Sequence, residues 1–263
     1  MINYPLVSII TIVLNNERFI EHALKSVICQ NYPNIEYIVK DGGSTDKTLA
    51  IIDRYKSKIS KFVSEKDKGL FDALNKAFEL ASGEIIGVLH SDDFYNNNDV
   101  INLVVHNILG KKADCCWGDL IFVSRNDINK NIRYWKSSEY RDGKFKYGWM
   151  PPHTTFFAKK EVYKKYGYFN LSLPVAADYE LMLRFLEKNR ISSCYIPHVL
   201  VKMRMGGQST KNFLNVIKGN IEVYRAWKIN SLDINPLIFF LKPSSKIIQF
   251  FKALFFNFYK SHK

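Results

Sequence analysis

The chain has 263 residues, of which 38 are basic and 25 acidic, so its net charge is +13. The hydrophobic fraction of 47% is that of an ordinary globular protein. The excess of positive charge indicates a polyanionic partner: nucleic acid, an acidic membrane surface or phosphorylated ligands. Nucleic acid is the weakest of these, because the sequence has no zinc-finger spacing, no aromatic RNA-binding motif and no uninterrupted basic arm.

The length predicts one large domain, or one domain with an appendage. The first residues lack the basic region of a secretory signal, so no leader is expected. The four cysteines have no metal-ligand spacing. On a strand, the adjacent Cys115 and Cys116 would point to opposite faces. We therefore expect reduced thiols and a cytoplasmic location.

In the first half of the chain, predicted strands alternate with predicted helices. Apolar, β-branched runs predict strands, and apolar residues spaced three and four apart predict helices. The predicted strands cover residues 7–13, 35–39, 61–64 and 85–89. The predicted helices cover residues 19–28, about 45–55, 70–81 and about 99–108. This alternation is typical of a doubly wound, mainly parallel α/β sheet.

After residue 112 the alternation becomes looser, and residues 137–150 are polar, aromatic and glycine-containing. Strands are predicted at residues 113–124, 131–136, 153–158 and about 191–196. Helices are predicted at residues 161–166, 178–188 and about 212–227. We expect these elements to complete one domain over residues 1–230.

The apolar run before Asp92 and Asp93 reads as a buried strand that ends in two adjacent carboxylates. Burying one carboxylate is costly, and a second beside it adds repulsion. A divalent cation with oxygen ligands relieves both costs and in turn binds phosphates. Strand ends are also where open α/β sheets bind their ligands. The alternative is a solvated turn, in which such pairs are common.

Three further carboxylates, Asp41, Asp67 and Asp178, follow predicted strands or begin a predicted helix. Together, these positions resemble the inverting family 2 glycosyltransferases, which have the GT-A fold. The resemblance covers roughly residues 5–210. The motifs that carry it lie at residues 7–11 with Asn15 and Glu17, 40–48, 65–76, 91–93, 151–155 and 177–180.

The resemblance implies donor-binding roles at the ends of the first two strands. Thr11, Asn15 and Glu17 would line the exit of the first strand, although Asn15 and Glu17 taken alone read as capping residues. The carboxylate of Asp41 could accept the ring N–H of a uracil or thymine. Its alternative is a turn residue in the sequence Asp-Gly-Gly-Ser.

The resemblance places three more donor-binding residues, Asp67, Lys68 and Gly69, at the start of the helix predicted from residue 70. Backbone N–H groups at such a helix start can face an anion. Lys68 could neutralise a phosphate, although a lone exposed lysine is more often simply solvated.

The metal motif of the resembled family is often Asp-X-Asp, and His90 occupies its first position here. The resemblance therefore assigns Mn²⁺ or Mg²⁺ to Asp93, with Asp92 in a ribose-binding or supporting role beside the metal. His90 could be a ligand, but a packed histidine is the more ordinary interpretation.

Asp178 is the candidate catalytic base, because direct displacement at an anomeric carbon needs a carboxylate to take the proton of the acceptor hydroxyl. Its alternative is an N-cap for the following helix. The resemblance puts His153 on the acceptor side of the site. Arg204 precedes a glycine-containing segment that resembles the family's closing loop, and it is expected to clamp a phosphate.

Residues 236–263 contain five lysines and no acidic residue. From residue 244 onward, Ile247, Phe251 and Phe255 share one helical face with further apolar residues, and lysines lie on the other. Residues 231–263 are thus expected to form a basic amphipathic tail suited to an anionic membrane surface. The alternative is a helix packed on the enzyme's own core or on a partner subunit.

These features predict a metal-dependent, inverting sugar transferase bound peripherally to the inner face of the cell membrane. The resemblance favours a UDP-linked donor and a lipid-linked glycan acceptor in cell-surface polysaccharide or lipopolysaccharide synthesis. Two alternatives remain. A sugar-nucleotide pyrophosphorylase would need a glycine-rich N-terminal signature, which is absent. A non-enzymatic membrane- or polyanion-binding module would bind lipid but release no nucleotide.

Overall fold

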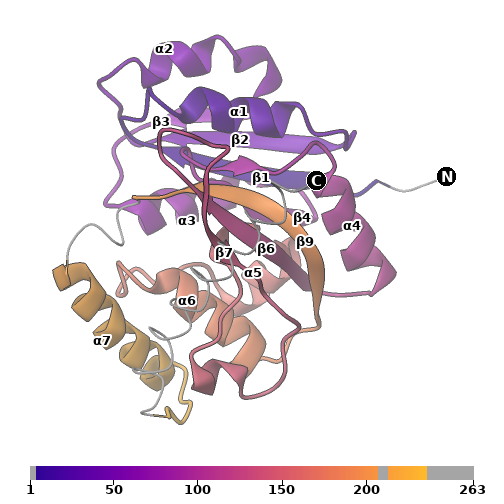
Figure 1. Ribbon diagram of the computed structural model, residues 1–263, viewed down its shortest axis with the longest axis vertical. Helices are drawn as coiled ribbons and strands as arrows, with labels where there is room; N and C mark the ends of the chain where they lie inside the picture. Colours follow the sequence, from indigo (N-terminus) through magenta and orange to yellow (C-terminus); the bar gives the residue numbers. More distant parts are fainter. Residues whose placement is uncertain (1–3, 207–212, 236–263) are drawn as a thin grey trace.

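The computed structural model describes residues 4–206 and 213–235. Its centre is one sheet in the order β3-β2-β1-β4-β8-β6-β9-β5, with β7 paired to β6 (Figure 1). The strands are β1 Val7–Val13, β2 Ile35–Asp41, β3 Lys61–Ser64, β4 Ile85–Val88, β5 Phe94–Tyr95, β6 Cys115–Val123, β7 Asn131–Trp135, β8 Phe157–Lys159 and β9 Ser193–Arg204.

Helices cover both faces of this sheet, as the alternating pattern predicts. They are α1 Ile20–Ile28, α2 Thr48–Asp53, α3 Leu70–Leu80, α4 Val100–Gly110, α5 Lys160–Tyr166, α6 Ala177–Met182 and α7 Phe213–Ile229. One core cluster lies under α1, α2 and α4, and the other lies under α3, α5, α6 and α7. Cys115 and Cys116 belong to opposite clusters, as expected from their alternation.

The first four strands of the path, β3, β2, β1 and β4, are all parallel. The remainder is mixed: β8 runs antiparallel to β4 and β6, whereas β6 and β9 are parallel. Gly87 makes the close pairing of β4 with β8 possible, because an added Cβ would lie 2.2 Å from the ring of Phe157. The α/β prediction is therefore confirmed as a parallel unit extended by mixed strands.

Three predicted elements differ from the structure. Residues 153–155 form a 3₁₀ turn before the short strand β8, because Thr155 Oγ1 donates back to the carbonyl of Pro152 at 2.8 Å. The helix predicted at residues 178–188 divides into α6 and the π-helical turns of Leu183–Lys188. Strand β9 continues past Pro197 to Arg204, since its register with β6 shifts near Gly118 and accommodates the proline.

The expected boundary at residue 230 falls just after α7, and the described chain continues past it to residue 235. Leu232 and Ile234 still pack against the core cluster below α7. The predicted amphipathic tail at residues 236–263 lies outside the described residues, so its helix stays a prediction.

Candidate active site

The parallel strands bring most of the predicted site residues to one edge of the sheet. Thr11 lies in β1 and Asp41 ends β2, while Asp67 follows β3 and Asp92 follows β4. Because β3, β2, β1 and β4 are parallel neighbours, their carboxyl ends meet at this edge. The candidate site is built around it.

Asp92 and Asp93 form the turn after β4, and they differ sharply in burial. The Asp92 side chain is 26% exposed, whereas Asp93 is 0% exposed. Asp93 Oδ1 accepts the backbone N–H of Arg204 at 3.3 Å. Asp93 Oδ2 has no hydrogen-bond partner among the described residues. Burial and the neighbouring Asp92 charge raise the pKa of Asp93 well above its usual value.

Two histidines connect this turn to the predicted base. The rings of His90 and His153 lie 5.9 Å apart between centroids. His153 Nδ1 in turn lies 3.7 Å from Asp178 Oδ2. Burial lowers the pKa of His90 to about 4, and the nearby His153 contributes to this shift. Asp178 is therefore in the same site as the Asp92–Asp93 turn, although the two segments are far apart in sequence.

Asp178 lies in the first turn of α6, and its side chain is 26% exposed. The N-cap of α6 is Ala176, so the N-cap alternative for Asp178 is wrong. The backbone just before it is fixed by α7: Glu222 Oε2 accepts the N–H groups of Val175 and Ala176 at 2.7 and 2.8 Å. A partly exposed carboxylate on a firmly held helix start can accept a proton from a bound hydroxyl.

The residues predicted at the exit of β1 hold neighbouring loops together. Thr11 is buried, and its hydroxyl accepts a hydrogen bond from Tyr37 at 3.1 Å. Asn15 Oδ1 accepts the N–H of Thr45 at 2.8 Å, and Glu17 accepts the N–H of Lys47 at 2.9 Å. Asn15 and Glu17 thus cap the loop before α2, which is the alternative that the sequence left open for them.

Asp41 likewise takes the turn role that was its alternative. It is 0% exposed, and its carboxylate accepts hydrogen bonds from the backbone of Gly43 and Ser44 at 2.9 and 3.0 Å. The hydroxyls of Ser44 and Ser64 donate to it as well. Because Asp41 is fully buried, contact with a nucleotide base would require the loop of Gly43 and Ser44 to move, so this geometry does not favour its expected donor role.

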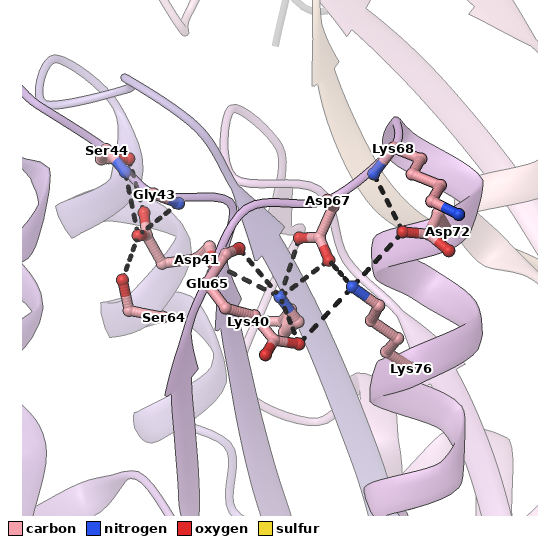
Figure 2. A network of polar contacts seen from close by, with 10 residues as sticks. All are labelled: Lys40, Asp41, Gly43, Ser44, Ser64, Glu65, Asp67, Lys68, Asp72 and Lys76. Carbon is pink, nitrogen blue, oxygen red and sulfur yellow. Dashed lines mark hydrogen bonds and ion pairs between the residues drawn. The ribbon is translucent and has the colours of Figure 1, made fainter.

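Asp67 lies between two lysines (Figure 2). The buried Lys40 donates to both Asp67 oxygens, at 3.0 and 2.8 Å, and Lys76 from α3 donates at 2.8 Å. The Asp67 side chain is only 5% exposed, so it fixes the loop rather than facing solvent. Beyond it, Lys68 is exposed and Gly69 has a φ of 139°, which L side chains rarely adopt.

The family was identified by comparison with known proteins. The sequence profile of "Glycosyl transferase family 2" matches residues 8–167. An uncharacterized glycosyltransferase of Rickettsia typhi is 34% identical over 229 residues, which cover 81% of this chain and 69% of that protein. The chain belongs to glycosyl transferase family 2. This membership decides against the pyrophosphorylase alternative.

Solved structures show the same fold at lower identity. The Staphylococcus aureus TarS fragment 1–349 in complex with UDP-GlcNAc matches with a TM-score of 0.66 and 20% identity. The match covers 86% of this chain and 65% of that fragment. The mannosyltransferase PcManGT from Pyrobaculum calidifontis, in complex with GDP-Man and Mn²⁺, matches with a TM-score of 0.64 and 19% identity, over 92% of this chain and 68% of that one. The chain thus has the GT-A fold.

The Asp92–Asp93 turn of this family 2 glycosyltransferase has the side chains to hold a divalent cation if a bound substrate supplies the remaining ligands. Within residues 4–206 and 213–235, no group of three or more histidine, cysteine or acidic side chains is close enough to hold a metal alone. Mg²⁺-type sites, however, commonly use one or two carboxylates together with substrate phosphates. The unpartnered oxygen of Asp93 and the partly exposed Asp92 supply those carboxylates.

Arg204, which the sequence predicts as a phosphate clamp, lies against the Asp92–Asp93 turn with its side chain buried. It is 5% exposed, and its guanidinium donates to the carbonyl of Asp92 and contacts His22 Nδ1 at 2.7 Å. It also lies between the rings of Phe19 and Phe94, at 4.8 and 4.9 Å from their centroids. Through these contacts Arg204 stabilises the Asp92–Asp93 turn. Its burial does not favour a role as a phosphate clamp.

Arg125, which the sequence analysis missed, faces the turn instead. Its Nη1 lies 3.9 Å from Asp92 Oδ2, and its side chain is 42% exposed. It also lies over Phe19, at 4.6 Å. The only available signal was its place just after the long predicted strand, at the same edge as the carboxylates.

None of the helices in the described part of this glycosyltransferase combines the length and the apolar character needed to cross a bilayer.

Proposed function

We propose that this chain transfers a sugar, with inversion, from a nucleotide-diphosphate sugar to a hydroxyl of a glycan acceptor. One observation supports this most: Asp178 lies 3.7 Å from His153, whose ring neighbours that of His90, two residues before Asp92, so a carboxylate lies near the Asp92–Asp93 turn but on a separate element. Inverting displacement needs this separation of roles, with a base on one side and the leaving diphosphate on the other.

In this proposal Asp92 and Asp93 hold Mn²⁺ or Mg²⁺ together with the donor diphosphate. Such an ion, when bound, neutralises charge that develops on the leaving nucleotide diphosphate. Asp92 is the more accessible of these two ligands to the donor, since its side chain is 26% exposed and Asp93 is 0% exposed. Arg125 is a second cation at the same edge, placed to attract the phosphates.

Asp178 accepts the proton of the acceptor hydroxyl as that oxygen attacks the anomeric carbon. His153, 27% exposed and 3.7 Å from Asp178, orients the carboxylate and lines the acceptor side. The donor is UDP-linked in this proposal, in keeping with the UDP-GlcNAc bound by TarS, whereas the GDP-Man bound by PcManGT marks the alternative. The acceptor is a lipid-linked saccharide, and residues 236–263 bring the enzyme to the cytoplasmic face of an anionic membrane.

A panel of UDP-, dTDP- and GDP-sugars tests the proposal. With Mn²⁺ present, one donor should give nucleotide diphosphate well above the enzyme-free rate, because water replaces the missing acceptor slowly in an assembled site. The measurement is coupled detection of the released nucleotide diphosphate. If no donor in the panel gives release, with or without a crude lipid-linked saccharide fraction, the proposed function is wrong.

A further inference from the structure

Helix α7 presents a basic and apolar face to solvent. Among the side chains of α7 that the structure describes, residues 217–229, four large apolar ones are exposed: Ile217, Ile221, Tyr224 and Ile229, at 44, 51, 42 and 47%. Three exposed cations, Lys218, Arg225 and Lys228, lie among them. The one acidic residue of α7, Glu222, is buried on the opposite side. We call these seven exposed residues the outer face of α7.

The inner face of the same helix is firmly attached to the domain. Val223 and Trp227 are buried in the core, and Trp227 Nε1 donates to the hydroxyl of Tyr179 at 2.9 Å. Just beyond α7, Asn230 donates to Glu180 at 2.9 Å. Helix α7 is therefore firmly packed on the domain through its inner face, and its outer face is exposed.

Within residues 217–229, the charged side chains beside the exposed apolar ones are all cations, and this narrows the choice of partner. A two-fold contact with a second copy would bring three cations against three others, which is unfavourable. The chain's own residues 236–263, with five lysines and no acidic residue, carry charge of the same sign. An anionic lipid surface offers negative headgroups for the cations and acyl chains for the isoleucines.

We propose that the outer face of α7 docks on an anionic lipid bilayer. The isoleucines and Tyr224 enter the boundary between headgroups and acyl chains, and the cations contact the headgroups. The inner face holds the start of α6 through Glu222, which fixes Val175 and Ala176 just before Asp178. Docking therefore fixes the orientation of the α6 start, and with it the base, relative to the bilayer that would carry a lipid-linked acceptor. This last consequence rests on the proposed function, whereas the docking itself does not.

Flotation of the full chain with liposomes tests this surface. The double variant I217E/I221E should lose binding to phosphatidylglycerol vesicles by about tenfold or more, because it removes apolar area and adds negative charge. The matched control is L109E on α4, a helix that lies apart from α7 (Figure 1), and its leucine is 50% exposed. That control should float like the wild type. Phosphatidylcholine vesicles should bind the wild type more weakly.

A charge variant keeps the test valid if the double variant fails to fold. K218E/R225E/K228E changes only exposed side chains. In about 0.1 M NaCl this variant should bind anionic vesicles more weakly than the wild type does. The difference between the two proteins should be smaller in about 0.5 M NaCl, because salt screens the charges. Unchanged flotation of both variants would show that another surface, or residues 236–263 alone, carries the contact, and would overturn the proposal. A wild-type dimer that I217E/I221E converts to monomer would overturn it too. Nucleotide release from a soluble donor is measured in parallel, so that a failure of docking and a failure of the proposed function can be told apart.

Discussion

Asp178→Asn is expected to reduce turnover by roughly 10²-fold or more, while the affinity for the nucleotide-sugar donor stays close to that of the wild type. The amide has nearly the same shape as the carboxylate but cannot accept the acceptor's proton. The side chain is 26% exposed and accepts only the N–H of Tyr179 among the described hydrogen bonds. An amide oxygen can keep that bond, so the fold should persist. Turnover and donor affinity are measured on the same preparation, by nucleotide release and by calorimetry.

Glu161→Gln is the matched control for Asp178→Asn. Glu161 occupies the first turn of α5 as Asp178 occupies that of α6, and its side chain is 73% exposed. Both changes remove one negative charge near a helix start, and the loss of a favourable dipole interaction is about 0.3–1 kcal/mol in each. If Asp178→Asn turns over as fast as Glu161→Gln, the base lies elsewhere in the site.

Asp92→Asn and Asp93→Asn are each expected to abolish most metal-dependent donor binding, a loss of about 10²-fold in affinity in the presence of Mn²⁺. Each change removes a negative oxygen that a divalent cation requires. The amide at residue 93 can still accept the N–H of Arg204, so the turn should keep its shape. Donor affinity is measured by calorimetry with Mn²⁺ and again with excess EDTA.

Asp53→Asn is the control for the two carboxylate variants, since its side chain is 76% exposed on α2 and forms only a 4.0 Å ion pair with Lys56. It should bind the donor like the wild type under both conditions. Full wild-type activity in excess EDTA would contradict a metal at Asp92 and Asp93. If Asp92→Asn and Asp93→Asn both bound the donor as tightly as the wild type, this too would contradict a metal at these residues.

The sequence predicted the parallel half of the fold well, because its central strands β1 and β4 are largely apolar and buried, and helical patterns separate all four strands. Val7–Val13 and Lys61–Ser64 have the predicted bounds. The prediction was weakest where non-local pairing decides the structure. Strand β5 is two residues long and depends on pairing with β9, so no local pattern indicates it. Likewise, β9 runs through Pro197 because β6 pairs with it along its length.

The sequence predicted which residues belong to the candidate site better than it predicted how their side chains are arranged. The strand ends and the first turn of α6 carry the expected carboxylates, since residue order and parallel topology suffice to bring them to one edge. The direction of a buried side chain depends on contacts that are distant in sequence. The guanidinium of Arg204 is buried because it contacts His22 and packs against the rings of Phe19 and Phe94. Arg125 faces Asp92 only because β6 ends beside the β4 turn.

Proton NMR of the anomeric signal in the earliest product distinguishes inverting from retaining transfer. With the donor found in the panel, early spectra are recorded before the free or transferred sugar can mutarotate. The new anomeric centre should have the configuration opposite to that of the donor, since Asp178 activates a nucleophile on the face opposite the leaving diphosphate. Retention of the donor configuration would contradict inverting transfer with Asp178 as the base, and so would release of a sugar phosphate instead of a nucleotide diphosphate.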